Sequence, residues 1–332
     1  MRTISGMSHH GVLPVVAFAI GWLIAEGSSD KQIRDGILAL TAGFGTYATL
    51  NMLVNIGNNR YRLIDFWTGT YRAATGSGAL NTLPISVAPY AVKFEKRLPV
   101  KIMFLALFFA TIQYMFMLGT RTQFAILLLI VILAALQFAY SEQGIAGVLK
   151  CIGIMAVISL IAFLLYHFNV LSIRDYILST NLAARYERRA SLENADSFRF
   201  QSFWIGLREL IQYPMGGRAS QIYRHNMWLD VGRVSGIIPF CLLLVYSIKN
   251  FANVTVIWKN TKILPSLRYL LLFLYIGAYV NCFVEPIWEG ALNFFLALCV
   301  VDGMVSAMMR RLENDPTPEE SVSDTSNLHT DL

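Results

Sequence analysis

The residues best suited to chemistry lie in one polar stretch, residues 197–236, within an otherwise apolar chain. This stretch contains His225 and several arginines, including Arg199 and Arg224. A histidine side chain can accept and return a proton near neutral pH, and an arginine presents a planar fork of donors that fits phosphate oxygens. The stretch runs directly into a new apolar segment, so His225 is expected where a loop meets the top of a membrane helix. The set predicts chemistry on a phosphate-bearing, lipid-linked substrate.

The elements that must position these residues are long apolar segments. The chain has 332 residues, of which 55% are hydrophobic and 14% are charged, and its mean hydropathy is +0.52. Runs of about 20 apolar residues can cross a hydrocarbon core of about 30 Å. The pattern predicts an all-α polytopic membrane protein with about nine transmembrane helices, near residues 12–26, 35–56, 79–92, 99–118, 122–140, 148–171, 227–248, 264–284 and 286–309. The third contains Pro84 and Pro89 and is expected to be kinked or broken.

These segments divide the chain into four parts. Transmembrane helices are expected over residues 1–171 and 226–311, with one long polar loop over 172–225 between them and a disordered acidic tail over 312–332. Lysine and arginine in short loops mark the inner side of a membrane protein. If the C-terminus is inside, all eight lysines are inside, and the loop 172–225 and the N-terminus are outside. An external N-terminus predicts either a miscounted span or further helices upstream of Met1.

The long loop is expected to contain an amphipathic helix. Its apolar residues recur on one helical face, with Arg208 and Glu209 off that face: Phe203, Trp204, Leu207, Leu210 and Ile211. Such a helix lies on the membrane surface or caps the helix bundle. Pro214 is expected to end it, and Gly216–Gly217 to form a tight turn before the chain returns to His225.

Composition argues against several other classes of protein. The net charge of +6 lies in loops between apolar segments, so no nucleic-acid partner is expected. All four cysteines fall inside apolar segments and are interpreted as small core residues. The chain has no Asp-x-Asp pair and no His/Cys cluster with ligand spacing, so neither a metal nor a cofactor is expected.

The spacing of residues in and after the long loop resembles the bacterial O-antigen ligase and O-antigen polymerase superfamily of membrane glycosyltransferases. The resemblance covers roughly residues 57–310 and rests on Arg199 with Trp204, Pro214 with Gly216, His225-Asn226 with Trp228-Leu229, Gly236, and Arg121 at the outer end of a helix. Thr120 stands where the family commonly has serine, and the glycines are adjacent where many relatives have Gly-x-Gly. Six expected spans precede the loop where relatives commonly have about nine, so about three upstream helices are expected to be missing.

The resemblance implies a GT-C-like fold in the bacterial inner membrane, with the active site facing the periplasm. It implies glycosyl transfer from an undecaprenyl-pyrophosphate-linked glycan, with His225 as general base and Arg121 and Arg199 binding pyrophosphate; Arg224 ranks second among the pyrophosphate ligands. The expected partners are this lipid-linked glycan, membrane lipids and a chain-length regulator. The alternatives are an interfacial histidine that packs at a helix start and an Arg121 that only reaches the headgroups.

Further outer residues could contact the glycan. Glu285, Trp288 and Glu289 lie in a short outer turn, where two carboxylates and an indole suit sugar hydroxyls and a sugar face. They could equally be helix-end carboxylates beside an interfacial tryptophan. Arg60, Arg62 and Arg72, near Trp67 and Tyr71, could bind a second pyrophosphate or only lipid headgroups.

Among the functions that fit, a polymerase that joins lipid-linked repeat units is preferred. Its donor and acceptor both carry pyrophosphate, and the outer arginines are numerous enough for two such groups. The alternative within the family is a ligase that transfers the glycan to lipid A-core. The alternative from another class is a transporter or flippase of lipid-linked oligosaccharide, which is disfavoured because no internal repeat is found and the spans are almost free of charge.

Overall fold

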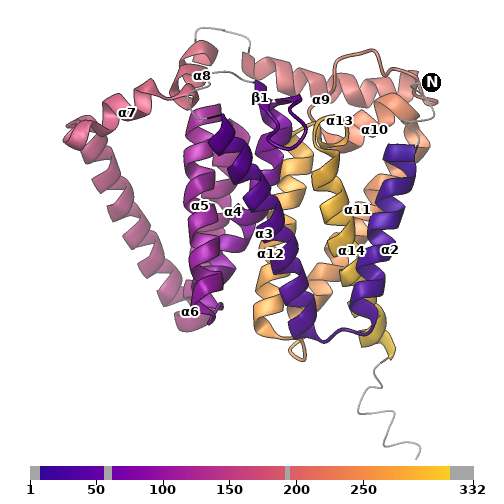
Figure 1. Ribbon diagram of the computed structural model, residues 1–332, viewed down its shortest axis with the longest axis horizontal. Coiled ribbons are helices and arrows are strands. Elements are labelled where there is room, and N and C mark those ends of the chain that lie inside the picture. Colours follow the sequence, from indigo (N-terminus) through magenta and orange to yellow (C-terminus); the bar gives the residue numbers. More distant parts are fainter. Residues whose placement is uncertain (1–7, 56–61, 191–194, 315–332) are drawn as a thin grey trace, which may run out of the picture.

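The computed structural model describes residues 8–55, 62–190 and 195–314 and shows a bundle of long helices (Figure 1). The described residues are 84% helical, which confirms the expected all-α class, and they include one small hairpin of β1 (Arg62–Ile64) and β2 (Tyr71–Ala73). Six of the described helices are long and apolar enough to cross a membrane: Asp30–Val54, Leu98–Leu118, Arg121–His167, Ile237–Lys259, Pro265–Val284 and Leu292–Asn314. The chain is therefore treated as a helical membrane protein.

The N-terminal half contains a short π-helix, η1 (Ser8–Val12), followed by α2 (Leu13–Glu26), α3 (Asp30–Val54), α4 (Ala74–Lys93) and α5 (Leu98–Leu118). Ser29 begins α3 through a capping box, because its hydroxyl and backbone N–H bond reciprocally with Gln32. The third span was expected to be kinked or broken at its prolines. A break is wrong, because α4 continues through both Pro84 and Pro89, and a kink stays a prediction.

The next helix, α6 (Arg121–His167), bends sharply into two arms. Gly144 has φ 60° and ψ −144°, a conformation that glycine adopts without a steric penalty. The two arms correspond to the spans expected near 122–140 and 148–171. Figure 1 shows the second arm diverging from the bundle, and its apolar side chains are exposed, including Ile145, Ile152, Ile158 and Phe163. Exposed apolar side chains on a helix of this length suit contact with lipid.

One end of the bundle carries the short elements and is called the loop face. It holds the hairpin, η2 (Val170–Ser172), α7 (Ile173–Ser179), α8 (Asn181–Ala190), α9 (Ala195–Gln212), α10 (Met227–Ser235) and α13 (Ile287–Gly290). These elements lie along the top of Figure 1. After α10, the chain runs along the bundle in alternating directions as α11 (Ile237–Lys259), α12 (Pro265–Val284) and α14 (Leu292–Asn314). The expected single span over 227–248 is corrected, because Gly236 separates the nine-residue α10 from α11.

The core lies where α3, α4, α12 and α14 pack together, around large buried side chains such as Tyr90, Tyr275 and Phe294. Small residues permit close helix crossings. A Cβ on Gly21 of α2 would lie 1.9 Å from the carbonyl oxygen of Val300, and one on Gly303 of α14 would lie 2.1 Å from the carbonyl oxygen of Phe18. This reciprocal contact lets the backbones of α2 and α14 approach as in other membrane helix pairs.

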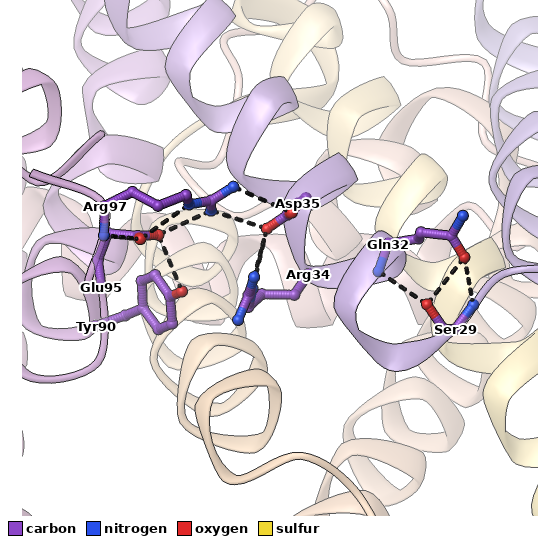
Figure 2. A network of polar contacts seen from close by, with 7 residues as sticks. All are labelled: Ser29, Gln32, Arg34, Asp35, Tyr90, Glu95 and Arg97. Carbon is purple, nitrogen blue, oxygen red and sulfur yellow. Dashed lines mark hydrogen bonds and ion pairs between the residues drawn. The ribbon is translucent and has the colours of Figure 1, made fainter. Parts of the chain in front are cut away.

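The opposite end is called the lysine face, and it contains the α2–α3, α4–α5 and α11–α12 connections and the end of α14. Figure 2 shows a network there in which Arg97 binds Asp35 of α3 and Glu95 of the α4–α5 connection. Arg34 also bonds Asp35, and the hydroxyl of Tyr90 donates to Glu95 over 3.4 Å. The network joins α3 to the α4–α5 connection at this end of the bundle.

The first three residues of the tail expected over 312–332 are helical, because Leu312–Asn314 continue α14. The remainder of that segment lies outside the described residues.

Candidate functional site

The loop between α9 and α10 folds back onto the junction of α10 and α11. The N–H of Ile237 donates to the carbonyl of Pro214 over 2.8 Å, and the N–H of Gly217 donates to Val234 over 3.0 Å. Gly216 and Gly236 have φ of 73° and 97°, and a Cβ on Gly216 would lie 2.5 Å from the backbone nitrogen of Gly236. Two motifs that are separate in the sequence therefore form one backbone contact that only glycine permits.

A buried ion pair holds the loop against α9. The guanidinium of Arg224 donates to both oxygens of Glu209, from Nε over 3.0 Å and from Nη2 over 2.6 Å. Both side chains are 9% exposed, and Arg218 approaches the same carboxylate at 3.6 Å. The α9 backbone comes close enough for this pairing because Gly206 packs against Leu229 and the stem of Arg224. In this arrangement the fork of Arg224 faces a carboxylate of the protein.

A second buried pair lies within α10. Asp230 accepts the backbone N–H of Arg224 over 2.6 Å and lies 3.6 Å from the guanidinium of Arg233. Arg233 also donates to the carbonyl of Gln221 over 2.9 Å and binds Glu289 of α13. Burial raises the pKa of the Asp230 carboxyl, while the N–H of Arg224 and the charge of Arg233 oppose that change. These contacts connect the loop, α10 and α13.

His225 lies between two residues that are fixed by the network. Its φ is 54°, in the left-handed region that costs an L-residue about 1–2 kcal/mol. The side chain is half-buried, and its ring meets Tyr223 edge-on at 4.7 Å. Asn226 caps α10 by accepting the N–H of Leu229, and its amide donates to the carbonyl of Phe283 over 3.1 Å. The turn thus holds His225 at the start of α10, as expected, but α10 is a short, largely buried helix at the loop face and not a span.

A further polar contact joins the end of α12 to the start of α6. Glu285, which is buried, accepts the hydroxyl of Thr122 in the first turn of α6. A carboxylate is favoured there because the N-terminus of a helix carries partial positive charge. Arg121 is half-buried beside Thr122, and its guanidinium lies 5.8 Å from the centre of the Tyr186 ring of α8. Glu285 and Arg121 therefore both lie at the N-terminus of α6.

Of the other residues expected at the site, the side chains of Trp288 and Glu289 in α13 are described. Trp288 is half-buried between His10 and Phe295, with ring centres at 5.2 and 5.7 Å, and Glu289 is exposed while it binds Arg233. Arg199 lies on α9, but its side chain is outside the described part of the structure. Arg60 lies outside the described residues, and for Arg62 and Arg72 only the backbone, in the hairpin, is described.

The expected apolar face of α9 is wrong in part. Glu209 and Leu210 are buried together with the small residues Ser202 and Gly206, whereas Trp204 and Ile211 are 55% and 79% exposed. The ion pair between Glu209 and Arg224 and the close contact at Gly206 determine which side of α9 packs against the rest of the protein. The exposed tryptophan and isoleucine suit a membrane surface.

Sequence reasoning also missed a buried carboxylate midway along one of the candidate membrane-spanning helices. Asp302 of α14 is fully buried and accepts the hydroxyls of Tyr246 from α11, over 2.7 Å, and Tyr275 from α12. An ionisable residue at this depth is rare and is usually functional or strongly paired. Asp302 stands alone among the apolar residues of its span, which is the signal that could have identified it.

A scan against protein-family models finds no match for this chain, and a search of curated proteins finds no match either. The fold and the loop face define the class, a helical membrane protein with a buried charged network at one end. Among the described residues, no group of three or more His, Cys, Asp or Glu side chains is arranged to hold a metal ion.

Proposed function

We propose that this protein is a bacterial inner-membrane glycosyltransferase with a GT-C-like architecture that joins undecaprenyl-pyrophosphate-linked repeat units at the periplasmic face. The contacts that connect His225 to Arg121 support this proposal most. Asn226 binds Phe283, and Glu285 binds Thr122, so the His225 turn, the end of α12 and the start of α6 with Arg121 are linked by successive contacts at one end of the bundle. A base and a phosphate-binding group on rigid elements are what such a transfer requires.

In the proposed reaction, the acceptor hydroxyl attacks the anomeric carbon of the donor sugar and the bond from that carbon to the pyrophosphate oxygen breaks. His225 takes the proton of the hydroxyl, a role that typically contributes about 10²–10⁴-fold. Arg121 and Arg199 stabilise the charge that develops on the pyrophosphate. The N-terminus of α6, which begins at Arg121, adds favourable backbone dipoles for an anion.

The network assigns Arg224 a different role within this proposal. Because two of its three guanidinium nitrogens donate to Glu209, Arg224 is proposed to hold the His225 turn in place and not to bind phosphate directly. Arg218 and Arg233 are likewise engaged by carboxylates, at 3.6 Å from Glu209 and from Asp230. Fewer arginines are thus left for a second pyrophosphate, which reduces the support for a polymerase over a ligase.

The proposed glycan contacts are Glu285, Trp288 and Glu289. Trp288 offers part of its ring to a sugar, since it is half-buried, and Glu289 is exposed beside it. Membrane lipids surround the apolar helices, and a chain-length regulator is proposed as a protein partner.

The test is glycan extension by purified protein in nanodiscs with an undecaprenyl-pyrophosphate-linked repeat unit. Polymer formation that is lost in His225→Gln, while donor binding persists, supports the proposal. If the wild-type protein transfers glycan only when lipid A-core is present, it is a ligase and the polymerase assignment is withdrawn. If the wild-type protein gives no transfer to either acceptor, the enzyme proposal is rejected.

A transporter or flippase of lipid-linked oligosaccharide is the second candidate, and Asp302 is the observation that favours it. A buried carboxylate bound by two tyrosines near the middle of three helices resembles the ionisable sites of proton-coupled transport. Proteoliposomes with fluorescent lipid-linked sugar distinguish the two functions. Translocation that Asp302→Asn abolishes and His225→Gln leaves intact favours transport; the reverse pattern in the extension assay favours the enzyme.

A further inference from the structure

Helix α11 carries a lysine in the middle of a candidate membrane span. The span expected over 227–248 left Lys249 in a loop, but α11 runs from Ile237 to Lys259 and continues through this residue. At a rise of about 1.5 Å per residue, Lys249 lies about 18 Å from the Ile237 end and about 15 Å from the Lys259 end. It is therefore near the midplane of a hydrocarbon core about 30 Å thick.

The side chain of Lys249 is exposed. Among the described residues, no hydrogen bond or ion pair engages its ammonium group. The buried carboxylate of Asp302 on α14 accepts the hydroxyls of Tyr246 and Tyr275 instead. Lysine side chains reach the headgroups from positions near helix ends, whereas a charge at mid-depth is costly unless it is paired. Lys249 thus needs an anionic partner that the described part of the chain does not supply.

Lys249 belongs to an exposed stripe that follows the length of α11. Its members recur at alternating spacings of four and three residues: Ile238, Leu242, Val245, Lys249, Ala252 and Val256. This spacing is the one by which two helices pack side by side along a common seam. The opposite side of α11 is buried in the bundle, at Ser247, Asn250, Val254 and Ile257. The stripe therefore faces away from the bundle, with one charge among apolar side chains.

We propose that this stripe binds a transmembrane helix of another protein that carries one carboxylate at the depth of Lys249. The attraction between opposite charges is strong where the dielectric constant is low, and each charge removes the need to leave the other unpaired in hydrocarbon. The apolar members of the stripe pack against the same helix on both sides of the ion pair. The pair thus fixes which helix binds and at what depth, independently of the proposed glycosyl transfer.

Charge complementarity favours this occupant over two others. A second copy of the chain, related by a two-fold axis along the membrane normal, would bring equivalent residues together, so that Lys249 would face the same lysine of the other copy. Like charges repel, and most strongly where the dielectric constant is low. Anionic lipid headgroups lie at the membrane surface, about 15 Å from the midplane. A carboxylate on a membrane helix supplies the opposite charge at the right depth.

The experiment uses the full chain in phosphatidylcholine vesicles and a synthetic leucine–alanine transmembrane peptide of about 20 residues. One peptide has glutamate at its centre, its companion has leucine there, and both carry a dansyl group at one end. Binding is measured as energy transfer from the tryptophans of the protein, of which Trp258 lies near the end of α11, and unlabelled peptide is the competitor. The glutamate peptide should bind about fivefold more tightly than the leucine peptide, the equivalent of about 1 kcal/mol.

Three variants test whether Lys249 causes this preference. Lys249→Leu should bind the two peptides equally, and its unfolding temperature should not fall, because leucine suits the centre of a membrane span. Lys249→Arg keeps the charge and should keep the preference. Lys259→Leu is the matched control, since Lys259 is exposed on the same helix but lies at its end; it should also keep the preference.

Four results would overturn the proposal. Equal binding of the two peptides by the wild type would show that the stripe does not select a carboxylate. A preference that survives in Lys249→Leu would place the recognition elsewhere. Self-association of the wild type that Lys249→Leu abolishes would show that a second copy covers the stripe. Loss of the preference when phosphatidylglycerol is added to the vesicles would show that a lipid headgroup pairs with Lys249.

Discussion

Glu209 binds Arg224 through two hydrogen bonds of 3.0 and 2.6 Å, with both side chains buried between α9 and the turn that carries His225. Charged groups removed from water to this degree depend on each other, because either one left alone keeps its desolvation cost. The pair thus makes the position of the turn depend on a helix that lies across the loop face.

The first prediction follows from that dependence. Glu209→Ala should lower the free energy of unfolding by about 3–5 kcal/mol, the range for breaking one partner of a buried pair. Thermal unfolding of the purified protein in detergent measures the loss. Glu209→Ala combined with Arg224→Met should recover part of it, because no unpaired charge remains. Arg208→Gln, at the exposed neighbour of Glu209, is the control and should change little. A Glu209→Ala protein with wild-type stability would show that the pair does not hold α9.

The second prediction separates backbone from chemistry at His225. Because φ is 54°, His225→Gly should leave stability unchanged or raise it by up to about 1–2 kcal/mol, while it removes any base. His225→Asn also tolerates this conformation but cannot accept the proton. Both variants should fold and should lose glycan extension if the proposed function is correct. Extension at the wild-type rate by either one would restrict His225 to a structural role.

The third prediction concerns the contact between the loop and the α10–α11 junction. A Cβ on Gly216 would clash with Gly236, whereas a Cβ on Gly217 would meet nothing within 4 Å, although both residues have positive φ. Gly217→Ala should cost about 1–2 kcal/mol from backbone strain alone. Gly216→Ala should cost more, since the junction must also move. Equal unfolding temperatures for the two variants would contradict the close contact.

The fourth prediction concerns acid at the lysine face. The hydrogen bonds from Arg97 lower the pKa of the Glu95 carboxyl to about 2, despite the opposing effect of burial. The stabilisation from Glu95 is therefore fully present above the ordinary glutamate pKa of about 4.3 and is lost as the pH falls toward about 2. Unfolding temperatures at pH 6 and pH 3 should differ less in Glu95→Gln than in the wild type. Glu142→Gln, at a half-exposed ion pair with Lys93 on the same end, should keep the wild-type difference.

The fifth prediction concerns the orientation of the bundle. Ser179 ends α7 at the loop face, and Ser141 lies in α6 near the bend at the lysine face. In a variant without the native cysteines, Ser179→Cys should react with an impermeant maleimide in intact cells from which the outer membrane barrier has been removed. Ser141→Cys should react only after the inner membrane is opened. The opposite pattern would place the loop face in the cytoplasm and reject a periplasmic active site.

The sequence alone determined most of the segments that form apolar helices, though not the separation of α10 from α11 at Gly236, and it determined that His225 follows a polar loop. Hydropathy is a property of a contiguous segment, and in a membrane the backbone must satisfy its hydrogen bonds within that segment. Proline and glycine also act locally, so the end of α9 before Pro214 and a change of chain direction near Gly216 and Gly217, both with positive φ, were also predictable. The resemblance in short motifs added the proposed roles of His225 and Arg121, which geometry by itself does not assign.

Only the tertiary structure decided the partners of the charged residues. Glu209 was placed on the outer side of its helix by apolar periodicity, yet it is buried, because the gain from pairing with Arg224 depends on a residue 15 positions away. The same holds for Asp302, whose hydroxyl donors come from two other helices. An ion pair or a buried hydrogen bond stabilises a fold only when both groups leave water together. Whether they do so is set by how distant segments pack, which no single stretch of sequence contains.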